Sequence, residues 1–123
     1  MKICISATGD NINSTVDPRF GRCPFYMIYD TENDSYEFIE NESRNAMGGA
    51  GIQAAQNVLS KGVEALITGN IGPNSFRVFE GAKIKIFTGV SGTLKEAIEK
   101  FKANQLTQTS GPSVQSHYGI GKE

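Results

Sequence analysis

The sequence contains few of the residues that build metal centres or disulfide frameworks. Among its 123 residues there are only two cysteines, Cys4 and Cys23, and one histidine, His117. A closed zinc site usually needs four nitrogen or sulfur ligands, and these three residues lie far apart in the sequence. Two cysteines are also too few for the framework of a small disulfide-rich secreted protein. We therefore expect a cytoplasmic protein with reduced thiols.

The chain also lacks a strong net charge and a long hydrophobic run. Its formal net charge is −1, and no four Lys or Arg residues form a cluster. The chain therefore has no global basic field to hold a nucleic-acid backbone, and the alternative of a local basic site stays open. No stretch approaches the ~18 apolar residues of a membrane span. The apolar start is too short for a signal peptide. We predict neither a nucleic-acid partner nor a membrane partner.

Hydrophobic patterning predicts a single mixed α/β domain. Apolar or β-favouring runs indicate five strands, and apolar residues at helical spacing indicate three helices. The strands are expected at 3–7, 25–31, 36–41, 65–68 and 84–88, and the helices at 52–59, from 73 onwards, and at 94–103. Thr93 and Glu96 fit a capping box at the last helix. The order β-β-β-α-β-α-β-α predicts an antiparallel meander, then parallel units, in one mixed five-stranded sheet flanked by helices.

The composition changes after Asn104. Residues 105–123 are rich in Gln, Ser, Thr and Gly and show no periodicity. Such a composition is typical of a mobile segment. We therefore predict a domain over residues 1–103 and a mobile C-terminal tail over residues 104–123. In this interpretation His117 is a solvated residue of the tail. The alternative is that His117 is a ligand residue that the mobile tail brings to a binding site.

Glycine-rich loops mark a candidate anion site. In open α/β sheets ligands gather where connections leave neighbouring strands in opposite directions, here expected between the first and fourth strands. Glycine-rich helix starts expose N–H groups that attract anions, although glycines can also serve only as turns. The candidate ligand-binding residues in these loops are Asp10, Gly49, Gly69, Asn70 and Gly89.

Side chains must add to these helix ends. One helix N-terminus contributes about 0.3–1 kcal/mol toward an anion, whereas even a millimolar ligand requires about 4 kcal/mol. Arg19 and Arg22 are the obvious candidates, because arginine binds oxyanions through two hydrogen bonds. Both cations would favour a Cys23 thiolate, which is a ligand for soft metals and iron–sulfur clusters. The alternative is that Arg19 pairs with Asp17 or Asp10 and that Cys23 is a small buried residue.

Signatures of catalysis are weak. The chain has no G-x-S-x-G motif and no Cys–His pair on predicted ordered structure. The predicted strands 3–7 and 65–68 contain no acidic residue, which disfavours two-metal hydrolysis. We therefore predict that the protein is not an enzyme. A weaker alternative is a hydrolase that acts through Asp10 and Asp17 with a divalent metal. Cys4 lies inside a predicted strand and is predicted to be a core residue.

Three segments in the same order resemble a known family. Residues 16–25, VDPRFGRCPF, are similar to the D-x-x-F-G-x-[AC]-x-x-F segment of the dinitrogenase iron–molybdenum cofactor biosynthesis family. Residues 48–55 and 66–74 also resemble its short single-domain members. The resemblance covers roughly residues 1–103 and implies a three-layer α/β/α, ribonuclease H-like fold. It also implies a relation to accessory proteins that bind, carry or insert the nitrogenase cofactor or its iron–sulfur precursor. Such members are generally carriers and not enzymes.

One position departs from the family pattern. Nitrogenase-associated members commonly have a histidine where this chain has Arg19, which leaves Cys23 as the nearest soft donor. Our first hypothesis is a non-catalytic carrier of an anionic iron–sulfur or iron–molybdenum-type cluster. Cys23 would be its metal ligand, Arg19 and Arg22 would neutralise its charge, and a cofactor-donor or acceptor protein would be its partner. The second hypothesis is a binder or regulator of a small oxyanion, such as a phosphate metabolite, that uses the same loops without Cys23.

Overall fold

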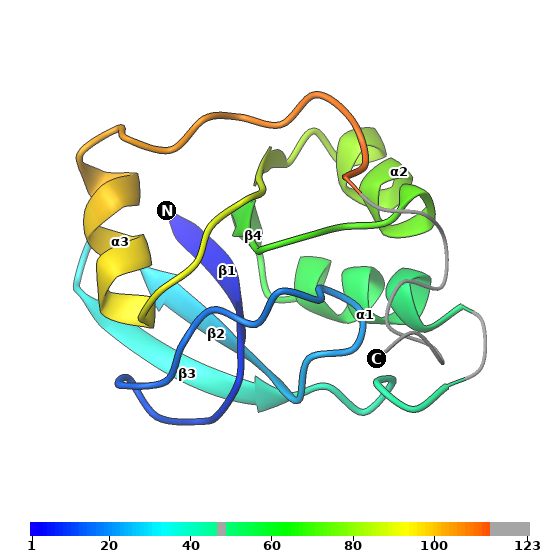
Figure 1. Cartoon of the computed structure of the whole chain (residues 1–123), viewed down its shortest axis with the longest axis horizontal. Coiled ribbons are helices and arrows are strands. Elements are labelled where there is room, and N and C mark those ends of the chain that lie inside the picture. The colour runs from blue at the N-terminus through cyan, green and yellow to red at the C-terminus, as the bar shows by residue number, and fades with distance from the viewer. Residues whose placement is uncertain (47–48, 114–123) are drawn as a thin grey trace.

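The computed structural model describes residues 1–46 and 49–113. Its helices and strands follow the predicted order (Figure 1). The strands are β1 (Lys2–Ala7), β2 (Phe25–Asp30), β3 (Ser35–Glu40), β4 (Val63–Ile67) and β5 (Lys85–Phe87). The helices are α1 (Ala50–Leu59), α2 (Pro73–Gly81) and α3 (Leu94–Lys102). None of the helices in the described ranges has the length and apolar character needed to cross a membrane.

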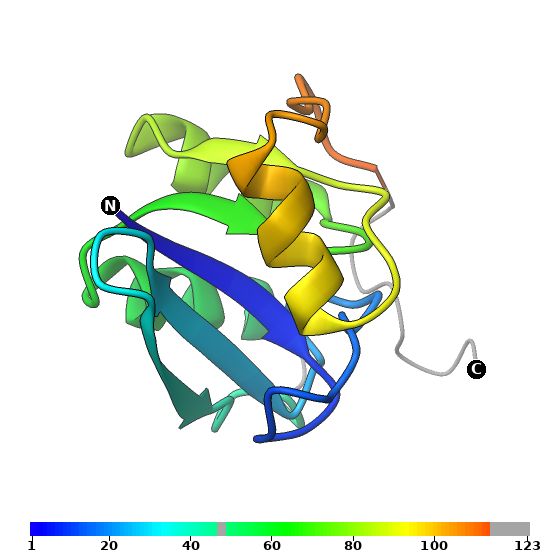
Figure 2. The ribbon, with the colours of Figure 1, turned by 90° about the vertical axis from the view of Figure 1, so that its left-hand side faces the viewer.

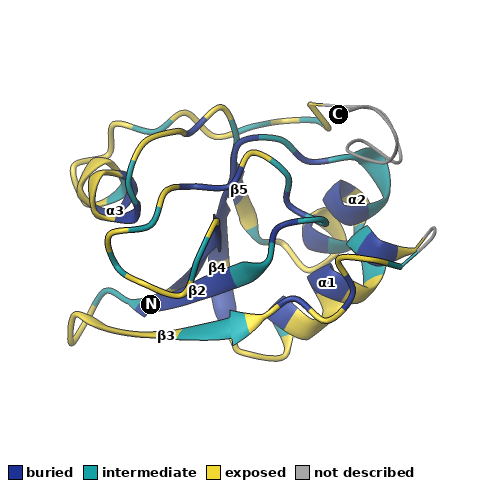
Figure 3. Cartoon of the chain, turned by 60° about the horizontal axis from the view of Figure 1, so that its bottom comes forward, coloured by how far each residue is buried: buried dark blue, intermediate teal, exposed yellow. Residues whose placement is uncertain are grey.

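The five strands form one mixed sheet in the order β3-β2-β1-β4-β5. β1 pairs antiparallel with β2, and β2 pairs antiparallel with β3, as expected of a meander. β4 pairs parallel with β1 and with β5, as expected of strand–helix–strand units. The centre of the sheet is β1, whose residues 3–7 are all buried, whereas the edge strand β3 is mostly exposed (Figure 3). The predicted mixed α/β sheet is confirmed.

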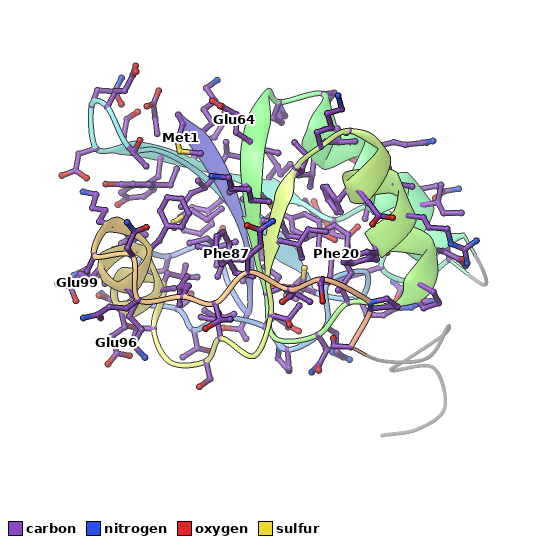
Figure 4. All side chains as sticks on the ribbon, turned by 90° about the horizontal axis from the view of Figure 1, so that it is seen from above. Met1, Phe20, Glu64, Phe87, Glu96 and Glu99 are labelled. Carbon is purple, nitrogen blue, oxygen red and sulfur yellow. The ribbon has the colours of Figure 1, made fainter. Side chains whose placement is uncertain are left out.

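Helices cover both faces of the sheet (Figure 2). Helices α1 and α2 pack on one face, where Val58 and Phe79 join Leu66 of β4 in a buried cluster. Helix α3 packs on the other face, where Leu94 and Ile98 join the β1 residue Ile3. Figure 4 shows Phe20 on the side of α2 and Phe87 on the side of α3. The arrangement has three layers, and the ribonuclease H-like label stays a prediction.

Local sequence signals set the start of α3. The Thr93 hydroxyl accepts a hydrogen bond from the Glu96 N–H at 3.1 Å, and the Glu96 carboxylate accepts one from the Thr93 N–H at 2.8 Å. These reciprocal bonds are the predicted capping box, and they satisfy two donors that a helix start otherwise leaves unpaired. The pKa of Glu96 is lowered chiefly because its carboxylate accepts from this backbone N–H.

Residues 105–113 differ from the mobile tail expected there. The Thr109 N–H donates to the Ile86 carbonyl at 2.7 Å, and the Thr88 N–H donates to the Thr109 hydroxyl at 2.9 Å. Further along, the Ser113 N–H donates to the Ile71 carbonyl at 2.9 Å. The segment therefore lies along β5 and crosses from α3 to α2, as the orange trace in Figure 1 shows. His117 lies outside the described residues.

Candidate functional site

A pocket of about 70 Å³ opens where the segment before β2 meets the first turns of α1 and α2. Its wall therefore comes from three parts of the chain that are distant in sequence. The lining residues are Arg19, Phe20, Gly21, Arg22, Gly49, Ala50, Gly51, Ile52, Asn70, Gly72, Pro73, Asn74 and Ser75.

Two helix N-termini meet at this pocket. Both N-cap residues, Gly49 and Gly72, are glycines, so neither has a side chain that could accept from the first-turn N–H groups. The first intrahelical bonds run from Gln53 to Gly49 and from Phe76 to Gly72, so the N–H groups of residues 50–52 and 74–75 precede them. Neither first turn contains an acidic residue. The pocket therefore has the positive end of two helix dipoles and donors without helical acceptors, as at anion sites.

Glycines allow the three walls to approach closely. A Cβ on Gly21 would lie 3.2 Å from the Gly51 Cα, so the Arg19–Arg22 segment touches the first turn of α1. A Cβ on Gly51 would overlap the Ser75 hydroxyl, so α1 and α2 also touch at their N-termini. A Cβ at Gly51 would require the Ser75 hydroxyl to turn away, whereas a Cβ at Gly21 would press on backbone atoms of α1. The close approach at Gly21 therefore depends on the absence of a side chain there.

The loop after β4 is held against the segment before β2. The Phe20 N–H donates to the Asn70 carbonyl, and the Asn70 side-chain amide donates to the Pro18 carbonyl, both at 3.2 Å. A Cβ on Gly69 would lie only 2.6 Å from the Pro18 Cα. Gly69 is therefore required for this contact, and its role is to let Asn70 reach the pocket wall.

Arg19 lies beside a buried acid. The Asp17 carboxylate, whose side chain is 4% exposed, accepts from the Arg19 N–H at 2.9 Å and from Arg19 Nε at 3.5 Å. The pairing with Asp17 that the sequence offered as an alternative is therefore present. Part of the positive charge of Arg19 is offset before any ligand binds.

Arg22 is held differently. Its Nη1 donates to the carbonyls of Arg44 and Ala46, at 2.8 and 2.5 Å. Carbonyl oxygens are neutral acceptors, so they orient the guanidinium without cancelling its charge. Arg22 therefore brings a full positive charge to the pocket wall, and it also fixes the loop that precedes α1.

The Cys23 thiol is buried and does not line the pocket. Its Sγ donates to the carbonyls of Phe20 and Phe25, at 3.3 and 3.2 Å. Burial raises its pKa from 9.0 to about 12. The expectation that the neighbouring arginines favour a thiolate is therefore wrong, because desolvation opposes the charged form. Cys4 is fully buried in the same cluster, as predicted.

The structure brings four of the predicted site residues to one pocket. Arg19, Arg22, Gly49 and Asn70 line it, whereas Asp10, Gly69, Gly89 and Cys23 do not. The Gly89 N–H already donates to the Gly69 carbonyl at 2.8 Å. The loop that contains Asp10 is hydrogen-bonded to the start of α3 through Ser14 and Leu94. Two of these departures, at Asp10 and Gly89, have one cause: the loops after β1 and β5 bond to other parts of the fold.

Sequence reasoning missed three residues that contribute to this site. Asn74 and Ser75 line the pocket from the first turn of α2, and Pro73 was the available signal because proline favours the first position of a helix. Asn41, which is 3% exposed, holds the backbone around Arg22 and had no local signal. In the described part of the chain, no three His, Cys, Asp or Glu residues are grouped as a metal site would require.

Known proteins are similar to this chain in sequence and in fold. The family model for the dinitrogenase iron–molybdenum cofactor matches residues 1–104. The chain belongs to the dinitrogenase iron–molybdenum cofactor family. The resemblance of the three sequence segments to this family is thereby confirmed.

One related sequence and two solved structures are similar to this chain over most of their own length. An uncharacterized protein of Methanocaldococcus jannaschii is 36% identical over 97 residues, which are 76% of this chain and 82% of that protein. The apo form of the orange protein of Desulfovibrio gigas is 33% identical, with a TM-score of 0.89, and the match covers 92% of this chain and 96% of that one. A putative NifB protein from Thermotoga is 34% identical, with a TM-score of 0.81, and the match covers 92% and 97%.

Proposed function

We propose that this protein binds and carries an anionic metal cluster, of the iron–molybdenum cofactor type or a precursor of it, in the pocket at the N-termini of α1 and α2. The observation that carries the proposal is the convergence of these two helix starts with Arg19 and Arg22 around one pocket. Membership of the dinitrogenase iron–molybdenum cofactor family supports the class of ligand. The similarity to a protein described in its apo form supports a binding role.

The donor set fits an anionic cluster held without metal–protein bonds. The pocket offers backbone N–H groups and two guanidinium groups, and both kinds of donor prefer negatively charged oxygen or sulfur atoms. Its volume of about 70 Å³ suits a small anion or one face of a larger cluster. The two cysteines of the chain are both buried away from it. Recognition by charge and hydrogen bonding follows, with the cluster as cargo.

Magnitudes favour a contribution from both kinds of donor. Two helix N-termini supply about 0.6–2 kcal/mol together. A hydrogen bond to a charged group adds about 1.5–3 kcal/mol. With Arg22 contributing at that level, the sum is about 2–5 kcal/mol, which reaches the roughly 4 kcal/mol of a millimolar complex. Such weak affinity suits a carrier that must release its cargo to another protein. We propose no catalytic role, and a cofactor-donor or acceptor protein would be the partner.

Metal analysis after anaerobic reconstitution tests this proposal. The protein is incubated with iron, molybdate and sulfide, freed of small molecules by gel filtration, and analysed for bound metal. We expect the wild type to retain metal and the Arg19→Gln/Arg22→Gln variant to lose most of it. A matched control is Lys95→Gln/Lys100→Gln, which removes two exposed charges from α3. Equal retention by both double variants would reject the pocket as the site.

Binding of a small oxyanion is the second candidate, and the small pocket volume favours it. Phosphate groups bind to helix N-termini and arginines through the same donors. A thermal-shift screen separates the candidates. Stabilisation by phosphate compounds that is lost in Arg22→Gln, with no metal retained after reconstitution, would favour the phosphate ligand over the cluster.

A further inference from the structure

Asn41 is a buried residue whose side chain is hydrogen-bonded to the backbone on both sides of Arg22. It follows β3 and is 3% exposed. Its side-chain amide donates to the carbonyls of Gly21 and Cys23, at 3.0 and 2.9 Å. These two carbonyls belong to the residues on either side of Arg22. The Asn41 side chain therefore fixes the backbone from which the Arg22 side chain leaves.

The same asparagine also organises the loop that receives the guanidinium. Its side-chain oxygen accepts from the Ser43 N–H at 3.1 Å, and its own carbonyl accepts from the Arg44 N–H at 3.3 Å. Its backbone N–H donates to the Pro24 carbonyl at 2.9 Å. The loop built on these bonds presents the Arg44 and Ala46 carbonyls to Arg22. Asn41 thus holds both ends of the Arg22 side chain.

The resulting orientation leaves part of the guanidinium available. Both of these hydrogen bonds of Arg22 use Nη1, and within residues 1–46 and 49–113 neither its Nε nor its Nη2 donates to the protein. Arg22 is also one of the residues that line the pocket. Arg19 differs because its Nε already bonds to the Asp17 carboxylate. Of the two arginines, Arg22 has the charge that no acid in this part of the chain offsets.

We propose that Asn41 is a positioning residue that pre-orients Arg22 as the main charge-recognising group of the pocket. Pre-orientation matters because an arginine side chain otherwise loses rotamer freedom on binding. No other residue type supplies this set of contacts, since the position needs two donors and one acceptor on a short, uncharged side chain. The expected effect of Asn41 on ligand binding rests on the proposed function, but the orientation of Arg22 can be measured without any ligand.

The first measurement is the nitrogen–proton spectrum of the free protein. A guanidinium held by two carbonyls is expected to give separate, slowly exchanging Nη signals, assigned to Arg22 by their absence in Arg22→Gln. We expect Asn41→Ala to lose these separate signals while the spectrum of α3 is unchanged. Asn41→Ser is the milder variant, to be used should Asn41→Ala fail to fold. Asn57→Ala is the matched control, because Asn57 is exposed on α1 and its side chain makes no bond in the described chain.

The second measurement is a double-mutant cycle on metal retained after reconstitution with iron, molybdate and sulfide. A bond to a charged group corresponds to about ten- to a hundredfold in affinity, so we expect Arg22→Gln to weaken retention by at least about tenfold. Asn41→Ala should weaken it nearly as much in the wild type and hardly further in the Arg22→Gln background.

The two measurements separate the two proposals. Unchanged Arg22 signals in Asn41→Ala would overturn the positioning role, as would an equal loss of retention in both backgrounds. Lost signals together with a wild type that retains no metal would uphold the positioning of Arg22 and reject the proposed cargo.

Discussion

Replacement of Gly69 by alanine should destabilise the protein strongly, although alanine is the smallest possible change. The new Cβ would lie 2.6 Å from the Pro18 Cα and 3.1 Å from the Pro18 carbonyl oxygen. Both neighbours are backbone atoms, so no side-chain rotation relieves the overlap. The loop after β4 must therefore move away from the segment before β2.

The cost follows from the contacts at stake. Overpacking of this kind costs about 1–3 kcal/mol. The shift also strains the two 3.2 Å bonds of Asn70, from the Phe20 N–H and to the Pro18 carbonyl, each worth about 1 kcal/mol. Depending on how far the two bonds are weakened, the total is about 1–5 kcal/mol, out of the roughly 5–15 kcal/mol that keep a domain folded. For a chain of this size the melting temperature should fall by about 10 °C.

Urea denaturation followed by circular dichroism measures this loss. Gly81→Ala is the matched control, because Gly81 ends α2 and a Cβ there meets nothing within 4 Å. That variant should be more stable than the wild type by roughly 0.4–1 kcal/mol, since alanine restricts the unfolded chain. A Gly69→Ala protein as stable as the wild type would refute the reasoning about the close approach at Pro18.

Three further predictions concern protonation and caps. Burial raises the pKa of Cys23 from 9.0 to about 12, so as the pH rises this thiol ionises in the unfolded chain before it ionises in the folded protein. The contribution of Cys23 to the free energy of unfolding should therefore be complete below about pH 9 and decrease above it. Urea titrations at several pH values should show a less steep decrease for Cys23→Ala. The hydrogen bond from the Thr93 N–H lowers the pKa of Glu96, so the stability that the Glu96 carboxylate contributes is present at neutral pH and lost in acid. In thermal unfolding, Glu96→Gln should differ from the wild type near pH 7 but not near pH 3. Thr93→Ala removes the cap itself and should cost about 0.5–2 kcal/mol in chemical denaturation.

Much of the fold could be predicted because its signals are local. The capping box at Thr93 and Glu96 is encoded within four neighbouring residues, and the structure has it at the same place. The three consecutive β-favouring runs at 3–7, 25–31 and 36–41 also predicted an antiparallel meander, and β2 pairs antiparallel with β1 and β3. The segment 105–113 could not be placed from composition, because the bonds of Thr109 and Ser113 to the main body join residues about 20 to 40 positions apart.

The site could be predicted only in part, for a related reason. Arg19 and Arg22 were identified by their chemical type, and the pocket contains both. Cys23 is buried in one cluster with residues as distant in sequence as Ala54 and Phe79, and no local pattern indicates that burial. The role of Asn41 depends on contacts across 18 to 20 residues, to Cys23 and Gly21. Residue type thus indicates possible chemistry, whereas tertiary contacts decide which groups reach the pocket.

The central claim is that the pocket holds its anionic cargo through N–H groups and arginine, without the Cys23 thiolate. The most direct test compares metal retained by the wild type, Cys23→Ala and Arg22→Gln after the same anaerobic reconstitution with iron, molybdate and sulfide. We predict equal retention by the wild type and Cys23→Ala, and at least about a tenfold weaker retention by Arg22→Gln, as expected for a lost bond to a charged group. Loss of metal in Cys23→Ala with full retention in Arg22→Gln would contradict the account.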